Sequence, residues 1–429
     1  MKAMKARSRF KINVSARAML AACLCLVFAT TAFAQGDLAG GVGQFAIQPK
    51  KEKAVAVARP KPPAVKAGPR ATANDRLLAA AGGGDAAALA GSLKQGADAN
   101  ARSKEGCAAL VYAVAAQDKS VAQSLLAKGA DANARCADGV TALMVAAEAG
   151  DAATAQSLVE RGADANAKTE DNRTALMFAA SNGQLAIVRA LLAKGADVNA
   201  RYRDGRTPLV FASANGFAAV AEALIAKGAD VNARADDGWT PLLWASWFGH
   251  IDVIKLLIER GADVRARDKD NDTALMKAAT QGHASVVQML LSKGAEADAR
   301  GNGGGTALLF SASRPSGYDV VEALIAKGAD VNARNEAGMT AVILAAAYGR
   351  VPTLDVLLAK GADVNAHTPK GFTALIAAAN KGLAATTQLL IEHGADVNAK
   401  YEDGRTALTF AQQNGQTKVV EILKNAGAK

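Results

Sequence analysis

A Gly-Ala pair that recurs every 33 residues constrains the fold of this chain more than any other feature. The pair ends a short apolar helix pattern eleven times, and only one step is 34 residues long. A fixed period of this length is typical of one small unit stacked repeatedly, which gives an elongated array with a long surface. The glycines are Gly96, Gly129, Gly162, Gly195, Gly228, Gly261, Gly294, Gly328, Gly361, Gly394 and Gly427.

The segment 204–234 shows how one unit is built. After an Asp-Gly turn, Thr207-Pro208 predicts a helix start, because the threonine hydroxyl can cap free N–H groups and proline has no N–H to lose. A second helix carries apolar residues at helical spacing and ends at Gly228. Two helices this short are marginal alone in water, so neighbouring units must supply the core.

The unit pattern, DGxTPL followed by a small-residue helix, a glycine and LLxxGADVNA, resembles the ankyrin repeat over residues 74–429. The resemblance implies an all-α repeat solenoid of about eleven stacked helix-turn-helix units with β-hairpin fingers. Residues 74–102 and 403–429 would be its caps. The histidine that usually follows TPL in this family is missing from every unit, so other contacts must join neighbouring fingers here.

The N-terminal region is predicted to lie outside the array. Residues 1–34 form the pattern of a bacterial secretory signal peptide, with a basic leader, an apolar stretch and a cleavage site between Ala34 and Gln35. The apolar stretch is short for a bilayer span, so no transmembrane segment is expected after cleavage. Cys23 matches a lipoprotein box only superficially, and its lipidation stays open. Residues 35–73 are rich in proline and lysine without regular periodicity, which predicts a disordered linker.

The basic net charge of +10 is concentrated before the array. Residues 1–73 hold 13 of the 50 Lys and Arg and 2 of the 40 Asp and Glu, which leaves 37 basic and 38 acidic residues in the array. Nucleic-acid binding usually needs a dominant basic patch. The charge balance therefore gives no support to a nucleic-acid partner.

Two cysteines, Cys107 and Cys136, remain after removal of the signal peptide. An even pair in an oxidising compartment favours a disulfide. Cys107 comes just after the turn of one finger and Cys136 just before the next turn, and such segments are neighbours in a stacked array. In the chain-entropy model, this loop would add about 3–4 kcal/mol of stability. The alternative is a pair of free thiols.

The motifs of common enzyme classes are absent from the sequence. It contains no HExxH, GxxxxGK[ST], GxSxG or CxxC. His250 and His283 occupy the same position in adjacent units, roughly 10 Å apart, whereas two ligands of one zinc ion need nitrogens within about 3.5 Å. We therefore expect no catalytic residues, no metal and no cofactor.

One irregularity interrupts the period. The glycine-rich run 301–305 lacks the Lys-Ser/Thr of a phosphate loop and is better interpreted as a flexible turn. It precedes the segment 313–317, which holds the single extra residue. Together they predict a soft joint between residues 74–300 and 306–429.

All three tryptophans and Phe248 fall in one unit. The ankyrin pattern places Trp239 on a finger and Trp247 and Phe248 on the inner helix, where relatives of this fold contact partners, while Trp244 would pack between layers. Exposed aromatic clusters commonly anchor interfaces; alternatively, these rings stack on one another and fill the core. The predicted partner-binding residues are Trp239, Trp247, Phe248, Arg206, Asp236, Asp237, Lys269, Asp270, Asp272, Met339, Tyr348 and Phe372.

These patterns predict a periplasmic or secreted, monomeric, non-catalytic scaffold whose concave surface holds another protein. The alternative is an accessory or carrier protein that binds a small molecule or cell-wall component at Trp239, Trp247 and Phe248. A protein partner should contact several units, whereas a small ligand needs only the tryptophan unit.

Overall fold

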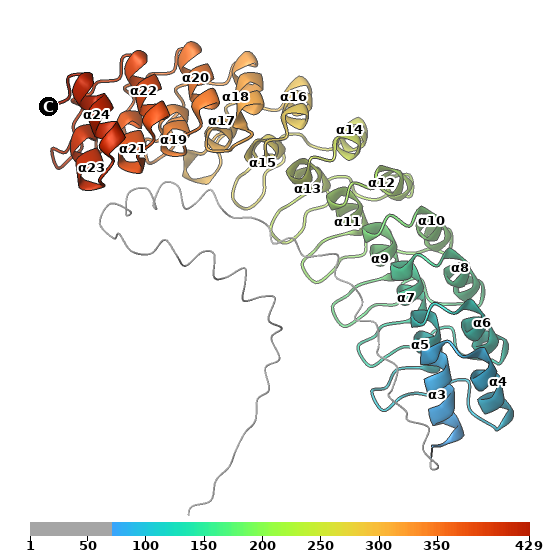
Figure 1. Ribbon diagram of the computed structural model, residues 1–429. Coiled ribbons are helices and arrows are strands. Elements are labelled where there is room, and N and C mark those ends of the chain that lie inside the picture. Colours follow the sequence, from blue (N-terminus) through green and yellow to red (C-terminus); the bar gives the residue numbers. More distant parts are fainter. Residues whose placement is uncertain (1–70) are drawn as a thin grey trace, which may run out of the picture. The chain divides into compact units, whose positions relative to one another are not determined.

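The computed structural model describes residues 71–429, which form a stack of eleven helix pairs (Figure 1). The predicted signal peptide with its cleavage site at Ala34 and Gln35, Cys23, and nearly all of the predicted linker lie outside the described residues. Each unit after the first consists of a finger, an inner helix and an outer helix, and the first is described from its inner helix onward. We name each unit after its inner helix. The inner helices follow one another along one side of the stack and the outer helices along the other (Figure 1).

The inner helices are α3 (Ala73–Gly83), α5 (Ala109–Ala115), α7 (Ala142–Ala149), α9 (Ala175–Ser181), α11 (Pro208–Ala214), α13 (Pro241–Phe248), α15 (Ala274–Gln281), α17 (Ala307–Ala312), α19 (Ala341–Ala347), α21 (Ala374–Lys381) and α23 (Ala407–Gln413). The outer helices are α4 (Ala86–Lys94), α6 (Lys119–Ala127), α8 (Ala152–Glu160), α10 (Leu185–Ala193), α12 (Ala218–Ile225), α14 (Ile251–Glu259), α16 (Ala284–Ser292), α18 (Gly317–Ala326), α20 (Val351–Ala359), α22 (Ala384–Glu392) and α24 (Thr417–Asn425). A short 3₁₀ turn, η3 (Asn302–Gly304), lies in the glycine-rich run.

The helix boundaries follow from the repeated threonine and glycine. Thr207 Oγ1 accepts a hydrogen bond from the amide of Val210, and the equivalent threonine caps every inner helix from α7 to α23. All eleven glycines of the period have positive φ, and Gly228 has φ of 87°. An added Cβ would meet nothing within 4 Å at Gly228, so it is the left-handed backbone that favours glycine.

The core consists of alanine and aliphatic side chains shared between units. Leu243 and Ala245 of α13 and Leu224 of α12 are fully buried. Each inner helix packs on the inner helices before and after it as well as on its own outer helix. Small alanines allow this close approach, and no pair has a core of its own. The predicted all-α solenoid of eleven units is confirmed.

The fingers differ from the β-hairpins that the resemblance implies. The described residues contain no strand, only four isolated bridges between finger bases, such as Arg267 with Thr273. Neighbouring fingers are joined by single backbone bonds, in which the amide of Asp236 donates to Asp204 O at 2.8 Å and that of Lys269 to Asp237 O at 3.0 Å. A turn of this length leaves too few paired residues for a ladder, so the fingers are tight turns.

A column of asparagines joins successive units at the loops that follow the outer helices. Asn199 donates through Nδ2 to Gly228 O at 3.1 Å and accepts through Oδ1 from the amide of Asp230 at 2.9 Å. We call this repeated pair of bonds the asparagine ladder. It is complete at Asn100, Asn133, Asn166, Asn199, Asn232, Asn332 and Asn365.

A column of arginines joins the finger bases in place of the missing family histidine. Arg201 Nη2 donates to Arg234 O at 3.1 Å, and Arg267 Nη1 donates to Arg300 O at 2.7 Å. Arg102, Arg234, Arg300 and Arg334 make the same bond to the next unit. Each guanidinium thereby bonds a backbone carbonyl at the base of the next finger, in a charge-assisted hydrogen bond.

The asparagine ladder is interrupted at two consecutive seams, between the α13 and α15 units and between the α15 and α17 units. Arg265 and Asp298 stand where the other units have asparagine. Arg265 Nε lies 3.5 Å from Glu296 Oε1, and no described residue accepts from the amide of Glu296. A groove of about 290 Å³ opens there, lined by Val264, Arg265, Arg267, Thr273, Ala295, Glu296 and Ala299. The finger bonds continue across the glycine-rich run, since the amide of Asn302 donates to Asp270 O at 2.9 Å.

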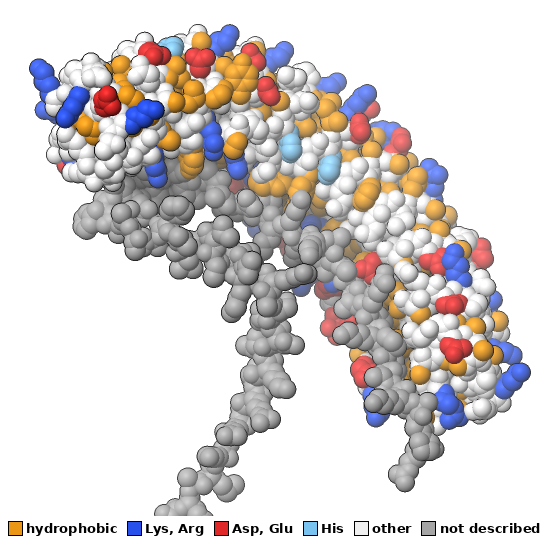
Figure 2. Space-filling view, viewed as in Figure 1, with side chains coloured by type: hydrophobic (Ala, Val, Ile, Leu, Met, Phe, Trp, Pro, Cys, Tyr) orange, Lys and Arg blue, Asp and Glu red, His pale blue; other side chains and the backbone are white. Residues whose placement is uncertain are grey.

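Basic and acidic side chains are interspersed over the face of the array visible in Figure 2. This distribution agrees with the near-zero charge of residues 74–429. Within residues 71–429, no helix combines the length and apolar character needed to cross a bilayer.

Candidate partner-binding surface

Two columns of side chains face one another along the inner side of the stack. The finger column consists of the residue before the N-cap of each inner helix from α5 to α23, and the helix column lies five residues later on the inner helix. The finger column contains Cys107, Val140, Arg173, Arg206, Trp239, Asp272, Gly305, Met339, Phe372 and Arg405. The helix column contains Tyr112, Val145, Phe178, Phe211, Trp244, Lys277, Phe310, Leu344, Ala377 and Phe410.

The tryptophan cluster is buried, which corrects its predicted exposure. Trp239 is 7% exposed and Trp247 is 8% exposed. The ring centroid of Trp239 lies 4.6 Å from that of Trp244 and 5.9 Å from that of Trp247, while Trp244 stacks on Phe248 at 6.1 Å. The rings cover one another because finger and helix both carry indoles in this unit. Of the predicted aromatic anchors here, only Phe248 is half-exposed.

A buried lysine that the sequence analysis missed lies beside this cluster. Lys277 Nζ is 2.7 Å from Asp268 Oδ2, donates to Asp272 Oδ2 at 2.8 Å, and lies 4.8 Å from the ring centroid of Trp239. Burial alone would lower the pKa of Lys277, but the two carboxylates outweigh burial and raise it. The signal was present in the sequence, because Lys277 is the one cation in a helix column of apolar residues.

Arginines of the finger column pack on rings of the helix column. The Arg206 guanidinium lies 5.0 Å from the Phe211 centroid and is paired with Asp204 at 2.7 Å. Arg405 packs in the same way on Phe410 at 4.2 Å and pairs with Asp403. Arg206 therefore packs within the array, in addition to its predicted role as a contact for a partner.

Arg173 makes the same pair with Asp171 at 2.6 Å. Burial would raise the pKa of Asp171, but hydrogen bonds from Arg173 and Thr169 outweigh it and lower the pKa to about 2. The carboxylate is therefore ionised at neutral pH, and the pair is neutral as a whole.

The remaining predicted residues are distributed unevenly over the surface. Asp236, Asp237, Lys269 and Asp270 are exposed on two adjacent fingers, and Tyr348 is 40% exposed. Partial burial raises the pKa of Asp237, and the nearby Asp204 and Asp268 carboxylates add to the rise. Asp272 is half-buried against Lys277, and Phe372 is half-buried against Tyr401 at 6.3 Å. Met339 is buried at 4% exposure, which corrects its predicted place on the surface.

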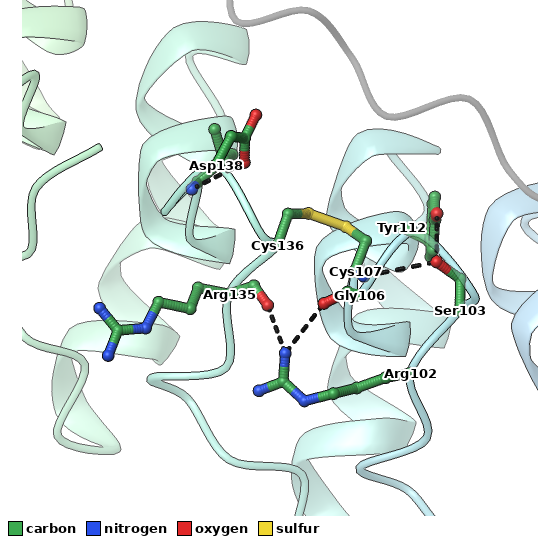
Figure 3. Close-up of a disulfide and its surroundings, with 9 residues drawn as sticks. Arg102, Ser103, Gly106, Cys107, Tyr112, Arg135, Cys136 and Asp138 are labelled. Atoms are coloured by element: carbon green, nitrogen blue, oxygen red, sulfur yellow. Dashed lines mark hydrogen bonds between the residues drawn. A yellow bond between two sulfur atoms is a disulfide. The ribbon is translucent and has the colours of Figure 1, made fainter. Parts of the chain in front are cut away.

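A disulfide joins Cys107 and Cys136 near the first units (Figure 3). It crosses from one finger to the next, and the loop between the two cysteines spans 29 positions. Around it, Arg102 Nη1 donates to Gly106 O at 3.0 Å and to Arg135 O, while the hydroxyl of Tyr112 donates to Ser103 Oγ at 3.0 Å (Figure 3). The bond and the arginine contact therefore join the same two fingers.

The two equivalent histidines hold neighbouring units together. His250 Nε2 lies 3.1 Å from Ala214 O, and His283 Nε2 lies 3.1 Å from Trp247 O, so each bonds the end of the preceding inner helix. Residues 71–429 contain no group of three or more His, Cys, Asp or Glu placed to hold a metal ion.

These features define a helical repeat solenoid with a rigid frame and a variable surface. The family description "Ankyrin repeats (3 copies)" matches residues 77–169, 110–202, 148–235, 176–268, 261–335, 302–368 and 342–429. These matches together cover well over half of the chain, which therefore belongs to the ankyrin repeat family. The family is typically one of non-catalytic scaffolds and suggests a protein partner.

Among solved structures, the chain is similar to the crystal structure of the human ASB11 ankyrin repeat domain. The two sequences are 28% identical, and the match covers 52% of this chain and 98% of that one with a TM-score of 0.48. No curated protein matches the chain at a significant level.

Proposed function

We propose that this chain is an exported, non-catalytic scaffold that holds a protein partner against the surface formed by the exposed finger tips and the partly exposed residues of the finger and helix columns. The observation that carries the proposal is the contrast between frame and surface within one chain. The capping threonines, period glycines and ladder asparagines are nearly uniform from unit to unit, whereas the two columns vary in charge, size and aromaticity. A stack needs the first set, whereas variation of the second set at its partly exposed positions fits recognition of one particular partner.

The mechanism is rigid presentation of side chains. Bonds between adjacent units occur at the asparagine ladder, at the finger bases and at the finger tips, as for Asn199, Arg201 and Asp236. Side chains on successive fingers are thus held before binding, and little ordering entropy is lost on association. The buried tryptophans shape the base of this surface, and the exposed finger aspartates are placed to contact the partner directly.

The test is affinity capture from the exported compartment with the full chain. Asp236→Asn/Asp237→Asn/Asp270→Asn removes three exposed finger charges. The control, Asp252→Asn/Glu259→Gln/Asp319→Asn, removes three exposed charges from outer helices. We expect loss of the captured protein with the finger variant and retention with the control. Equal recovery with both variants would remove this surface from the proposal.

Export is tested separately through the mature protein itself. We expect a mass that begins at Gln35 in the exported fraction, rather than a lipid-bearing chain that begins at Cys23, and no free thiol at Cys107 or Cys136. A chain that retains residues 1–34 would refute the cleavage, and two alkylated thiols would refute the disulfide in the exported protein. Light scattering of the same material tests for the expected monomer.

The alternative, a carrier for a small molecule or cell-wall component at Trp239, Trp247 and Phe248, has weaker support. The indoles of Trp239 and Trp247 are buried against Trp244 and Lys277, so they offer little free ring surface. Captured material that contains a small ligand and no protein would favour this alternative.

A further inference from the structure

An exposed tyrosine with cations around it stands apart from the rest of the surface. Tyr348, at the end of α19, is one of the two large hydrophobic side chains that are exposed in residues 71–429. The Arg350 guanidinium lies 6.0 Å from its ring centroid. Arg314 and Arg350 both act electrostatically on the Tyr348 hydroxyl, while partial burial raises its pKa. The hydroxyl is therefore a hydrogen-bond donor at neutral pH.

A backbone hydrogen bond holds Arg350 and its positive charge beside Tyr348. Arg350 Nε donates to Ser313 O at 2.9 Å, which is the contact that the histidine makes in the α13 and α15 units. The histidines there are compact and half-buried, whereas a guanidinium makes the bond with one nitrogen and brings a permanent charge with four further donors. The loop it holds contains the extra residue of the array and carries Arg314.

The cationic patch extends into the next unit. Lys381, at the end of α21, occupies the position of Tyr348 one unit further on, and its side chain is exposed. The inner helices α17, α19 and α21 contain no acidic residue. Among the described residues, no carboxylate forms an ion pair with Arg314, Arg350 or Lys381. By contrast, Arg173, Arg206 and Lys277 each pair with a carboxylate on the finger of their own unit.

We propose that Tyr348, Arg314, Arg350 and Lys381 form a docking patch for an acidic segment of a partner protein. This rests on the proposed scaffold function and adds the chemistry of the partner at one place. Guanidinium groups bind carboxylates in a forked geometry, the tyrosine hydroxyl donates to the same acceptors, and tyrosine with arginine is the composition of interface hot spots. The near-neutral charge of the array favours a short acidic segment over a nucleic acid, which needs a long basic surface.

The experiment uses the full mature chain and a fluorescein-labelled peptide of six glutamates and two leucines. The test variant, Arg314→Gln/Lys381→Gln, removes two cations whose side chains make no bond to described residues. The control, Lys327→Gln/Lys360→Gln, removes two exposed cations at the ends of outer helices of adjacent units. We expect binding by the wild type and the control, and binding about tenfold weaker for the test variant, on the scale of one charge-assisted bond.

Tyr348→Ala should weaken binding of this peptide with no change in the melting temperature. Parallel titrations use a lysine-leucine peptide of the same length, a 20-base-pair DNA duplex and phosphatidylglycerol vesicles. Equal binding by the test and control variants would overturn the patch, and so would tighter binding of DNA or vesicles than of the acidic peptide. If the acidic peptide fails to bind while protein capture still depends on Asp236, Asp237 and Asp270, the inference is wrong and the scaffold function stands.

Discussion

The α13 unit and the α19 unit both bring aromatic rings to the inner side of the stack, yet only the second leaves one exposed. Trp239 is covered by Trp244, Trp247 and Lys277, so it is 7% exposed. Tyr348 has Arg350 against its ring and is 40% exposed. The comparison teaches that rings at facing positions of finger and helix pack on one another, whereas an isolated ring beyond the helix end remains open to a partner.

The largest expected effect tests the burial of the tryptophan cluster. Trp239→Ala should destabilise the α13 region by about 3–5 kcal/mol because it empties a packed site. Tyr348→Ala should change stability by less than about 0.5 kcal/mol. Native-state hydrogen exchange of peptides from α13 and α19 measures both, since unfolding of a long array need not be two-state. Similar losses for the two variants would contradict the assignment of one ring to the frame and the other to the surface.

The second prediction concerns the buried charges that distinguish the α15 unit. Lys277→Met should cost about 3 kcal/mol, because Asp268 and Asp272 would keep buried charges without their cation. Adding Asp268→Asn should recover part of this loss. The cost of Lys277→Met should also shrink as pH falls and the Asp272 carboxylate, whose pKa is raised by burial, becomes protonated. Urea denaturation at pH 7 and pH 4 measures this, and an equal cost at both values would show that the charges are not responsible.

The fold was predictable from the sequence, because the period, the capping threonine and the terminal glycine recur in nearly every unit and each has one local meaning. The exposure of individual side chains on the finger and helix columns was not predictable from the sequence. Trp239 and Met339 occupy finger positions where relatives contact partners, but burial depends on the side chain that faces each one across the column. The role of Lys277 depends likewise on Asp268 and Asp272, nine and five residues before it, which only the folded finger brings to its ammonium group.

The third prediction compares two finger pairs of the same kind. The pKa of Asp171 is about 2, below the ordinary value near 4, so its contribution to stability is present above pH 4 and is lost as pH falls toward 2. Asp171→Asn should therefore cost about 2 kcal/mol at pH 7 and almost nothing near pH 2. Asp403 pairs with Arg405 at an exposed site, and Asp403→Asn should cost less. Thermal melts across this range measure the difference, and a cost for Asp171→Asn that does not depend on pH would refute the ionic origin.

The smallest expected effect tests the seam between the α13 and α15 units. Arg265→Asn restores the residue that joins most other units, so its amide can donate to Gly294 O and its carbonyl can accept from the amide of Glu296. We expect a gain of about 1 kcal/mol, the net value of one or two hydrogen bonds.

The amide of Glu296 should exchange faster than that of Asp263 in the wild type, because Asn232 caps only the latter. Arg265→Asn should remove this difference, and Asn332→Arg should create the same weakness at Asp363. Equal exchange of Glu296 and Asp263 in the wild type would mean that the interrupted ladder leaves this seam as stable as its neighbours.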